Sequence, residues 1–149
     1  MANSRLPAYV GGWEVAHFEE LFDYPRPSRE LPPIGEGHTY FHLFLDGGFT
    51  NPMDRDKIEQ SRGICVDMYG EAQILLKISG NATVFDKFYT LEAMQRGGSD
   101  HQLVYEGSNF NIPIKNKGIF EIVMGVVTCK IPEGFRPVPF IMRSRDPII

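Results

Sequence analysis

Apolar and aromatic residues alternate with a period of two along most of the chain that follows Gly37. In Thr39–Asp46, for example, Phe41, Leu43 and Leu45 alternate with Tyr40, His42 and Phe44. Such alternation places successive side chains on opposite faces of an extended strand. The segments that read as strands are Thr39–Asp46, Gly63–Tyr69, Ala72–Ser79, Thr83–Glu92, Gln102–Glu106, Ile119–Lys130 and Pro139–Arg143.

Turn sequences rich in glycine separate these segments, among them Gly47-Gly48, Gly80-Asn81 and Lys117-Gly118. About seven or eight short strands with little helix between them indicate an antiparallel sandwich or barrel. Several strands carry apolar residues on both faces, which favours a closed barrel: one face lines the interior and the other meets the N-terminal segment or a partner subunit. The sequence therefore predicts an all-β fold, a small antiparallel closed β-barrel over residues 38–149.

The first 37 residues differ from the rest, and we expect them to form an arm that packs on the barrel or on a neighbouring subunit. Trp13–Tyr24 fits a short helix, with Val15, Phe18 and Phe22 on one side, although strand alternation fits almost as well. Prolines at positions 25, 27, 32 and 33 exclude a helix interior or a central strand over Pro25–Gly37.

Composition narrows the function classes. The formal net charge is −4 and basic residues are scattered, so we predict no nucleic-acid partner. No apolar run is long enough to span a bilayer, and residues 1–7 lack the apolar core of a signal peptide; we expect no membrane association and a cytoplasmic location. Cys65 and Cys129 are expected to be free thiols, and the scattered histidines predict no metal site and no cofactor.

Three stretches carry a resemblance. Phe49-Thr50-Asn51 precedes Gly63-Ile64-Cys65-Val66, then comes Glu71-Ala72, and finally Tyr105-Glu106 is followed by Lys117-Gly118-Ile119-Phe120-Glu121 and Gly125. In this order they resemble the allene oxide cyclase barrel and its relatives, which include dirigent-like proteins and bacterial polyketide cyclases. The likeness covers roughly residues 49–143. The early strand departs from the family, because Tyr40–Leu45 contains neither the acid nor the amide found there, and Ile122 replaces a glycine.

The resemblance implies a calycin-like barrel that forms a homo-oligomer, a dimer or trimer. It also implies that Asn51 helps to hold a substrate oxygen and that Cys65 faces the barrel interior. By the period of two, Asp67 and Tyr69 would share that wall, where a thiol, a carboxylate and a phenol bind a polar group or move a proton. The alternatives are that Cys65 is a small core residue, and that Asp67 lies at a rim, pairs with Arg or Lys, or stays protonated in the cavity.

Aromatic residues are the remaining candidates. Tyr40, His42 and Phe44 share one strand face, which either lines the cavity, with His42 as acid or base, or faces outward under the Trp13 segment. Tyr69 and Tyr105 are further candidates for substrate binding.

The resulting prediction is a cofactor-independent cyclase or isomerase with Asn51, Cys65 and Asp67 as catalytic residues. It would act on an apolar polyunsaturated, polyketide-like or terpenoid-like small molecule by confining it in a hydrophobic cavity. The alternatives are a non-catalytic, lipocalin-like protein that binds a hydrophobic ligand, and a structural or virion-associated β domain.

Overall fold

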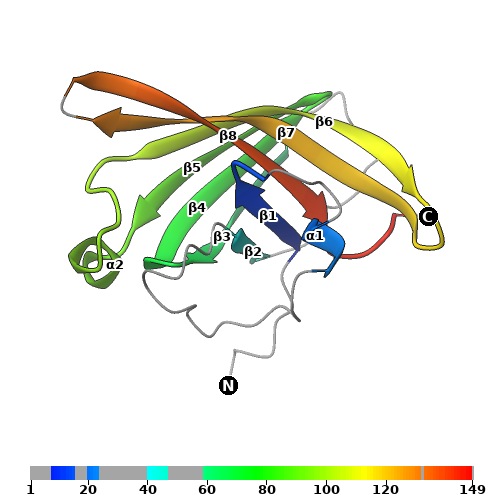
Figure 1. Cartoon of the computed structure of the whole chain (residues 1–149), viewed down its shortest axis with the longest axis horizontal. Coiled ribbons are helices and arrows are strands. Elements are labelled where there is room, and N and C mark those ends of the chain that lie inside the picture. Colours follow the sequence, from blue (N-terminus) through cyan, green and yellow to red (C-terminus); the bar gives the residue numbers. More distant parts are fainter. Residues whose placement is uncertain (1–7, 16–19, 24–39, 47–58, 132, 149) are drawn as a thin grey trace.

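The computed structural model describes residues 8–15, 20–23, 40–46, 59–131 and 133–148 (Figure 1). The described chain contains eight strands and two short helices. The strands are β1 (Tyr9–Trp13), β2 (Tyr40–Leu45), β3 (Glu59–Asp67), β4 (Gly70–Ser79), β5 (Ala82–Tyr89), β6 (Leu103–Ile114), β7 (Gly118–Ile131) and β8 (Gly134–Ser144). The helices are α1 (Glu20–Asp23) and α2 (Leu91–Gln95).

The strands form one closed barrel in which each strand pairs antiparallel with the next, and β8 returns to pair with β1. This confirms the predicted antiparallel closed barrel. The closing ladder runs from Tyr9 opposite Ser144 to Trp13 opposite Phe140. The barrel therefore begins earlier than expected, because β1 lies within the segment that the sequence assigned to an arm. The proline-rich part of that arm falls outside the described residues.

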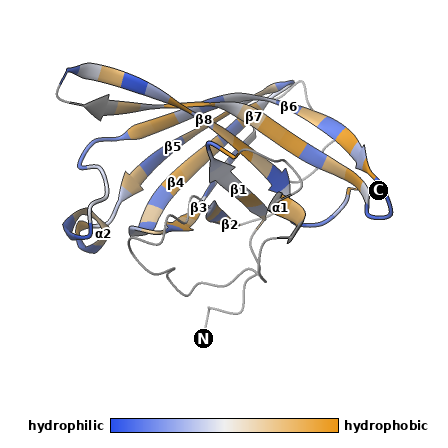
Figure 2. Cartoon of the chain, in the orientation of Figure 1, coloured by the Kyte–Doolittle hydropathy of each residue, from blue (hydrophilic) through white to orange (hydrophobic). Residues whose placement is uncertain are grey.

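Alternation along each strand separates the interior from the outer surface, and bands of hydrophobic and hydrophilic residues follow one another along β6 and β7 (Figure 2). On β5 the inward side chains are Thr83, Phe85, Lys87 and Tyr89, all buried. The interior cluster draws on the inward faces of all eight strands. Closing the sheet leaves no edge along the paired part of the barrel, so its backbone groups are satisfied by neighbouring strands.

Aromatic rings fill the middle of the barrel. The ring of Phe85 stacks on that of Tyr105 at a centroid distance of 4.1 Å, and Phe140 meets Tyr105 edge-on at 5.1 Å. The ring of Phe41 also meets that of Tyr105 edge-on, at a centroid distance of 6.0 Å. Ring contacts of this kind exclude water and fix each side chain's position. The middle of the barrel is therefore packed with aromatic rings.

A second, smaller cluster lies on the outer face of β6, β7 and β8, where α1 covers it. Leu21 of α1 is fully buried against Phe120, Ile122 and Ile141. Arg143 stabilises this contact. Its Nε donates a hydrogen bond to the Leu21 carbonyl oxygen at 2.9 Å, and its guanidinium group lies over two aromatic rings of the cluster. The outer face of the barrel is thus covered by α1 at this apolar cluster, while other outward apolar side chains, such as Phe88 and Met124, are exposed.

Gly107 of β6 faces Gly125 of β7, and the two backbones lie close together at this position. A Cβ atom added to Gly125 would meet the carbonyl oxygen of Glu106 and would lie 2.5 Å from Cα of Gly107. Both obstacles are backbone atoms, which cannot rotate away. The curvature of the barrel at this position therefore requires glycine.

We expect Gly125→Ala to lower the free energy of unfolding by about 1–3 kcal/mol, because the added methyl group forces the two backbones apart. Chemical denaturation of the purified proteins measures the change. Ser108→Ala, an exposed change on the same stretch of β6, is the control and should stay within about 0.5 kcal/mol of the parent. Equal stability of Gly125→Ala and the parent would contradict this role of Gly125.

Candidate functional site

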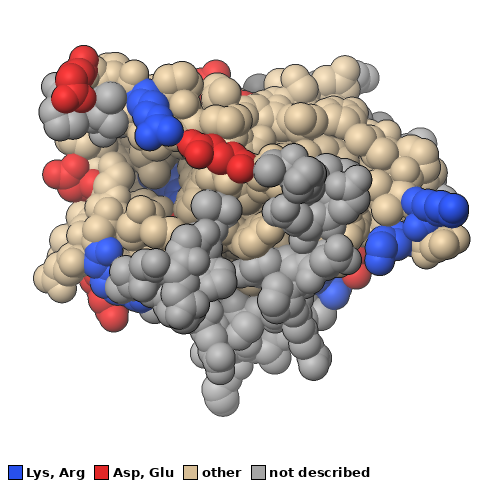
Figure 3. Space-filling model, in the orientation of Figure 1, with Lys and Arg blue, Asp and Glu red and all other residues tan. Residues whose placement is uncertain are grey.

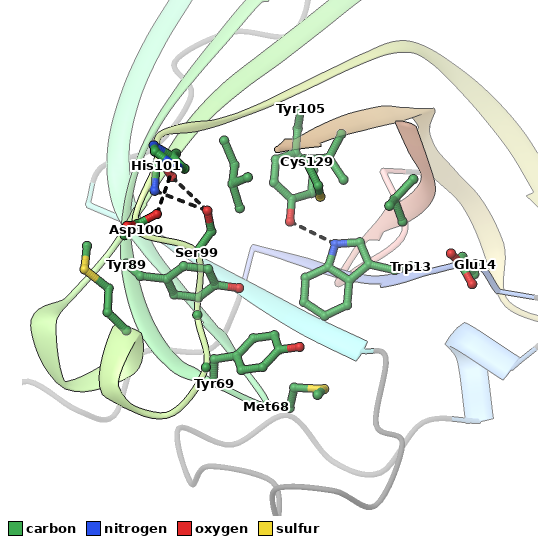
Figure 4. Close-up of a pocket in the computed structure, with 16 residues that line it drawn as sticks. Trp13, Glu14, Met68, Tyr69, Tyr89, Ser99, Asp100, His101, Tyr105 and Cys129 are labelled. Carbon is green, nitrogen blue, oxygen red and sulfur yellow. Dashed lines mark hydrogen bonds and ion pairs between the residues drawn. The ribbon is translucent and has the colours of Figure 1, made fainter. Parts of the chain in front are cut away.

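A cavity of about 850 Å³ opens at the end of the barrel where α2 lies. Its walls are mostly aromatic and aliphatic. Trp13 and Tyr105 lie on one side of the cavity, and Tyr69 and Tyr89 lie on the other (Figure 4). Cavities that bind small molecules commonly have this size and composition, with few polar groups. The lining residues come from β1, the β3–β4 turn, β5, α2 and its following loop, and the adjoining ends of β6, β7 and β8.

The α2 segment forms one wall of the cavity. Thr90 caps the helix, since its Oγ1 accepts a hydrogen bond from the Ala93 amide at 3.2 Å. Ala93 then packs against Gly70, and the backbone turns back at Gly97, whose φ of 108° suits glycine. This turn carries Ser99, Asp100 and His101 to the rim of the cavity.

Beneath the cavity lies a fully buried ion pair between β3 and β5. Lys87 Nζ is 2.6 Å from Asp67 Oδ2, and neither side chain is exposed to solvent. The same carboxylate accepts a hydrogen bond from the Tyr89 hydroxyl at 2.6 Å and one from the Tyr69 amide at 2.9 Å. Two buried charges are tolerated when they meet each other and further donors satisfy the carboxylate.

Tyr105 links this ion pair to the cavity. Its hydroxyl oxygen accepts hydrogen bonds from Lys87 Nζ at 3.3 Å and from Trp13 Nε1 at 2.8 Å (Figure 4). Lys87 also lies over aromatic rings, with Nζ 4.9 Å from the centroid of Trp13 and 4.5 Å from that of Tyr89. The ammonium group is therefore held by a carboxylate, a phenol and aromatic faces together.

Burial sets the protonation states in this cluster. It raises the pKa of the Cys65 thiol from 9.0 to about 12, and it also raises the pKa of Tyr89 and Tyr105 above their ordinary value. Burial alone would lower the pKa of Lys87, but the surrounding groups Cys65, Tyr105, Asp67 and Tyr89 outweigh it and raise that pKa well above 10.5. Near neutral pH the thiol and the phenols are thus protonated and Lys87 is a cation.

The structure brings part of the predicted site together. Asp67 and Cys65 point to the interior from β3, both buried, and Tyr69 and Tyr105 line the cavity. Of the options left open for Asp67, pairing with a lysine is the one observed. Asn51 lies outside the described residues.

The three aromatic candidates on β2 lie elsewhere. Phe41 and Leu43 occupy the interior face, so Tyr40, His42 and Phe44 face the other side of the sheet, and none of the three lines the cavity. Tyr40 packs against the outer cluster, and His42 contacts Phe44 edge-on at a centroid distance of 6.4 Å. The outward orientation was one of the two alternatives for this face, and α1, from the segment that follows Trp13, packs against the outer cluster that includes Tyr40. Trp13 itself lies inside the barrel, where the centroid of its ring is 5.3 Å from that of Phe41.

Sequence reasoning missed Lys87, Tyr89 and Trp13. A signal for Lys87 was available: it follows Phe85 by two residues and precedes Tyr89 by two, so it sits on the apolar face of its strand. A lysine on such a face needs an acid within the barrel, and Asp67 had already been singled out as an acid in an apolar strand.

Comparison of the chain with family models, with curated proteins and with solved structures gives no match. The likeness to the allene oxide cyclases therefore rests on the short motifs alone and stays a prediction. Within the described residues, no helix is long and apolar enough to cross a membrane. Nor do three His, Cys, Asp or Glu side chains gather at a metal-binding distance anywhere in that part of the chain.

Removing one partner of the ion pair should be far more damaging than removing both charges. We expect Lys87→Met to lower the free energy of unfolding by about 3–5 kcal/mol, because it leaves the Asp67 carboxylate buried and uncompensated. The double variant Lys87→Met/Asp67→Asn should recover most of that loss, since asparagine still accepts hydrogen bonds. Urea unfolding of the three proteins tests this, and a double variant no more stable than the single one would contradict it.

Alkaline pH should destabilise the protein in part through Cys65. The unfolded thiol loses its proton near pH 9.0, whereas the folded one keeps it to about pH 12. Between these values the folded state binds more protons, so the free energy of unfolding falls as pH rises, by about 1.4 kcal/mol per pH unit for this group. The raised pKa of Lys87 acts in the same direction above 10.5.

In Cys65→Ala this contribution is absent, and the loss of stability just above pH 9.0 should be shallower than in the parent. Denaturant unfolding at pH values on both sides of 9.0 measures the two slopes. Parallel curves would mean that the thiol titrates alike in the folded and unfolded chains.

Proposed function

We propose that the protein binds a mainly apolar small molecule in the cavity beside α2 and acts on it as a cofactor-independent cyclase or isomerase. The observation that carries this proposal is the aromatic cavity of about 850 Å³ whose floor is a rigid, fully buried hydrogen-bonded cluster. Such a cavity restricts a flexible chain to few conformers before reaction, which removes part of the entropic barrier to ring closure.

The protonation states support confinement rather than covalent catalysis. A nucleophilic cysteine acts as a thiolate and a Schiff-base lysine acts as a neutral amine. Burial keeps the pKa of Cys65 at about 12 and the surroundings keep the pKa of Lys87 well above 10.5, so both groups carry their protons near neutral pH. The cluster is suited to orienting a bound molecule and to excluding water from it.

A non-catalytic carrier is the second candidate, and the same closed set of hydrogen bonds favours it. Lys87, Asp67 and Tyr89 satisfy one another, so none of them is left to attack or deprotonate a ligand. The two candidates share the binding site and differ in whether the bound molecule leaves unchanged. Mass analysis of a bound molecule before and after incubation with the protein separates them.

Binding can be followed through Trp13, which is the only tryptophan of the chain and lies in the cavity wall. An apolar ligand, such as a polyunsaturated fatty-acid methyl ester, should change its emission. Met68→Arg, which places a charge in the cavity, should weaken binding by about tenfold or more, because the guanidinium group must be desolvated or must occupy the space.

The matched control is Met124→Arg, the same change at a half-exposed position on the outer face of β7, which should bind like the parent. A saturable emission change that is lost in both variants, or in neither, would place the ligand elsewhere. Organic extraction of protein purified from its own host, followed by mass spectrometry, then identifies the natural ligand.

A further inference from the structure

We propose that the Tyr105 hydroxyl is the hydrogen-bond donor that holds a carbonyl oxygen of the ligand, and that the ligand is a neutral carbonyl compound rather than a free carboxylic acid. The inference rests on the proposed function, because it assumes that the cavity binds a small molecule. It adds the substrate class and the residue that recognises it.

The hydrogen bonds of the Tyr105 hydroxyl group use its oxygen as an acceptor and leave its proton available to donate. Its oxygen accepts from Trp13 Nε1 at 2.8 Å and from Lys87 Nζ at 3.3 Å, which uses both lone pairs of the phenol. The phenolic proton has no acceptor among the described residues, although the side chain lines the cavity. A protonated hydroxyl that faces a cavity and lacks an acceptor is a site for a ligand oxygen.

The two donors also strengthen this hydroxyl. Both withdraw electron density from the phenol oxygen, and one of them is a cation in a region of low dielectric constant. The O–H group becomes a better donor, and it is fixed in place before the ligand arrives. Such an arrangement stabilises negative charge that develops on a carbonyl oxygen during a rearrangement, with no proton transfer required. Lys87 acts here through Tyr105, as a positioning and polarising residue.

The charges around the cavity select against a carboxylate ligand. Glu14 and Asp100 line the cavity, as does His101, whose Nε2 lies 3.1 Å from Asp100 Oδ1; among the described residues, neither a lysine nor an arginine lines it. Lys87 below the floor is already neutralised by Asp67, and Arg136 pairs with Glu14 at 3.2 Å on the exposed rim. A free carboxylate would lose its hydration beside two acids whose basic neighbours, His101 and Arg136, already pair with them.

Three matched fluorescent probes test the proposal: a ketone (propionyl-dimethylaminonaphthalene), its parent without the carbonyl group (dimethylaminonaphthalene), and the corresponding carboxylate (dimethylaminonaphthoate). The ketone's emission moves to longer wavelength when its carbonyl oxygen accepts a hydrogen bond. The variant is Tyr105→Phe. The control is Tyr40→Phe, which removes a phenolic hydroxyl group from the outer face of β2, where the residue packs against the outer cluster and does not line the cavity.

We expect the parent protein to bind the ketone about tenfold more tightly than the carboxylate, with a hydrogen-bonded emission from the bound ketone. Tyr105→Phe should weaken ketone binding by about three- to tenfold, the range of one neutral hydrogen bond, and shift the bound emission to shorter wavelength. It should leave the parent hydrocarbon within about twofold. Tyr40→Phe should change neither property. The double variant Lys87→Met/Asp67→Asn should shift the emission part of the way.

Several outcomes would overturn the inference. One is that the carboxylate binds more tightly than the ketone, above all if Arg136→Ala abolishes that binding. Another is that the emission of the bound ketone lacks the hydrogen-bond shift in the parent protein, or that the shift persists in Tyr105→Phe. If Tyr105→Phe does not fold, the ketone-to-hydrocarbon ratio and the emission of the parent protein decide the matter. Failure of all three probes to bind would count against the proposed function itself, whereas equal binding of ketone and hydrocarbon would reject only the role of Tyr105.

Discussion

The buried pairing of Lys87 with Asp67 is the constraint on which the rest of the site depends. Two charges withdrawn from water are stable only when they meet each other and when further donors complete the carboxylate. Meeting that condition ties together strands that are distant in the sequence: β3 supplies Asp67, β5 supplies Lys87 and Tyr89, β6 supplies Tyr105 and β1 supplies Trp13. The floor of the cavity is therefore as rigid as the barrel that carries it.

The barrel divides into a packed middle and an open end, and this division shapes the functional argument. Stacked rings around Tyr105 leave no room for a ligand at the centre. The cavity lies at the end of the barrel that carries the α2 segment and the β7–β8 turn (Figure 1). A ligand held there touches aromatic walls and one polarised hydroxyl, while the outer surface in view carries interspersed acidic and basic side chains (Figure 3).

Much of the fold followed from local patterns, whereas the site followed only in part. The period of two located β2 to β8, although β6 and β8 extend further than the pattern indicated and the end of the segment Thr83–Glu92 forms the start of α2. Apolar residues on both faces of the strands correctly favoured a closed barrel. The strand β1 (Tyr9–Trp13) was not predicted, because the first 37 residues were assigned to an arm. Asp67 stood out because an acid in an apolar strand needs an explanation. Lys87 did not, since a single lysine among aromatic residues reads as a solvated position.

The sequence by itself determined that the chain forms short antiparallel strands joined by turns and favoured a barrel over a sandwich, because alternation and turn residues act between near neighbours. Only the tertiary structure decided which inward residues meet: the register of β3 to β5 through β4 brings Asp67 to Lys87, and the closure of β1 on β8 brings Trp13 to Tyr105. Register and closure depend on the summed packing of the whole interior, and a shift of one residue would turn every one of these groups to the opposite face of the sheet.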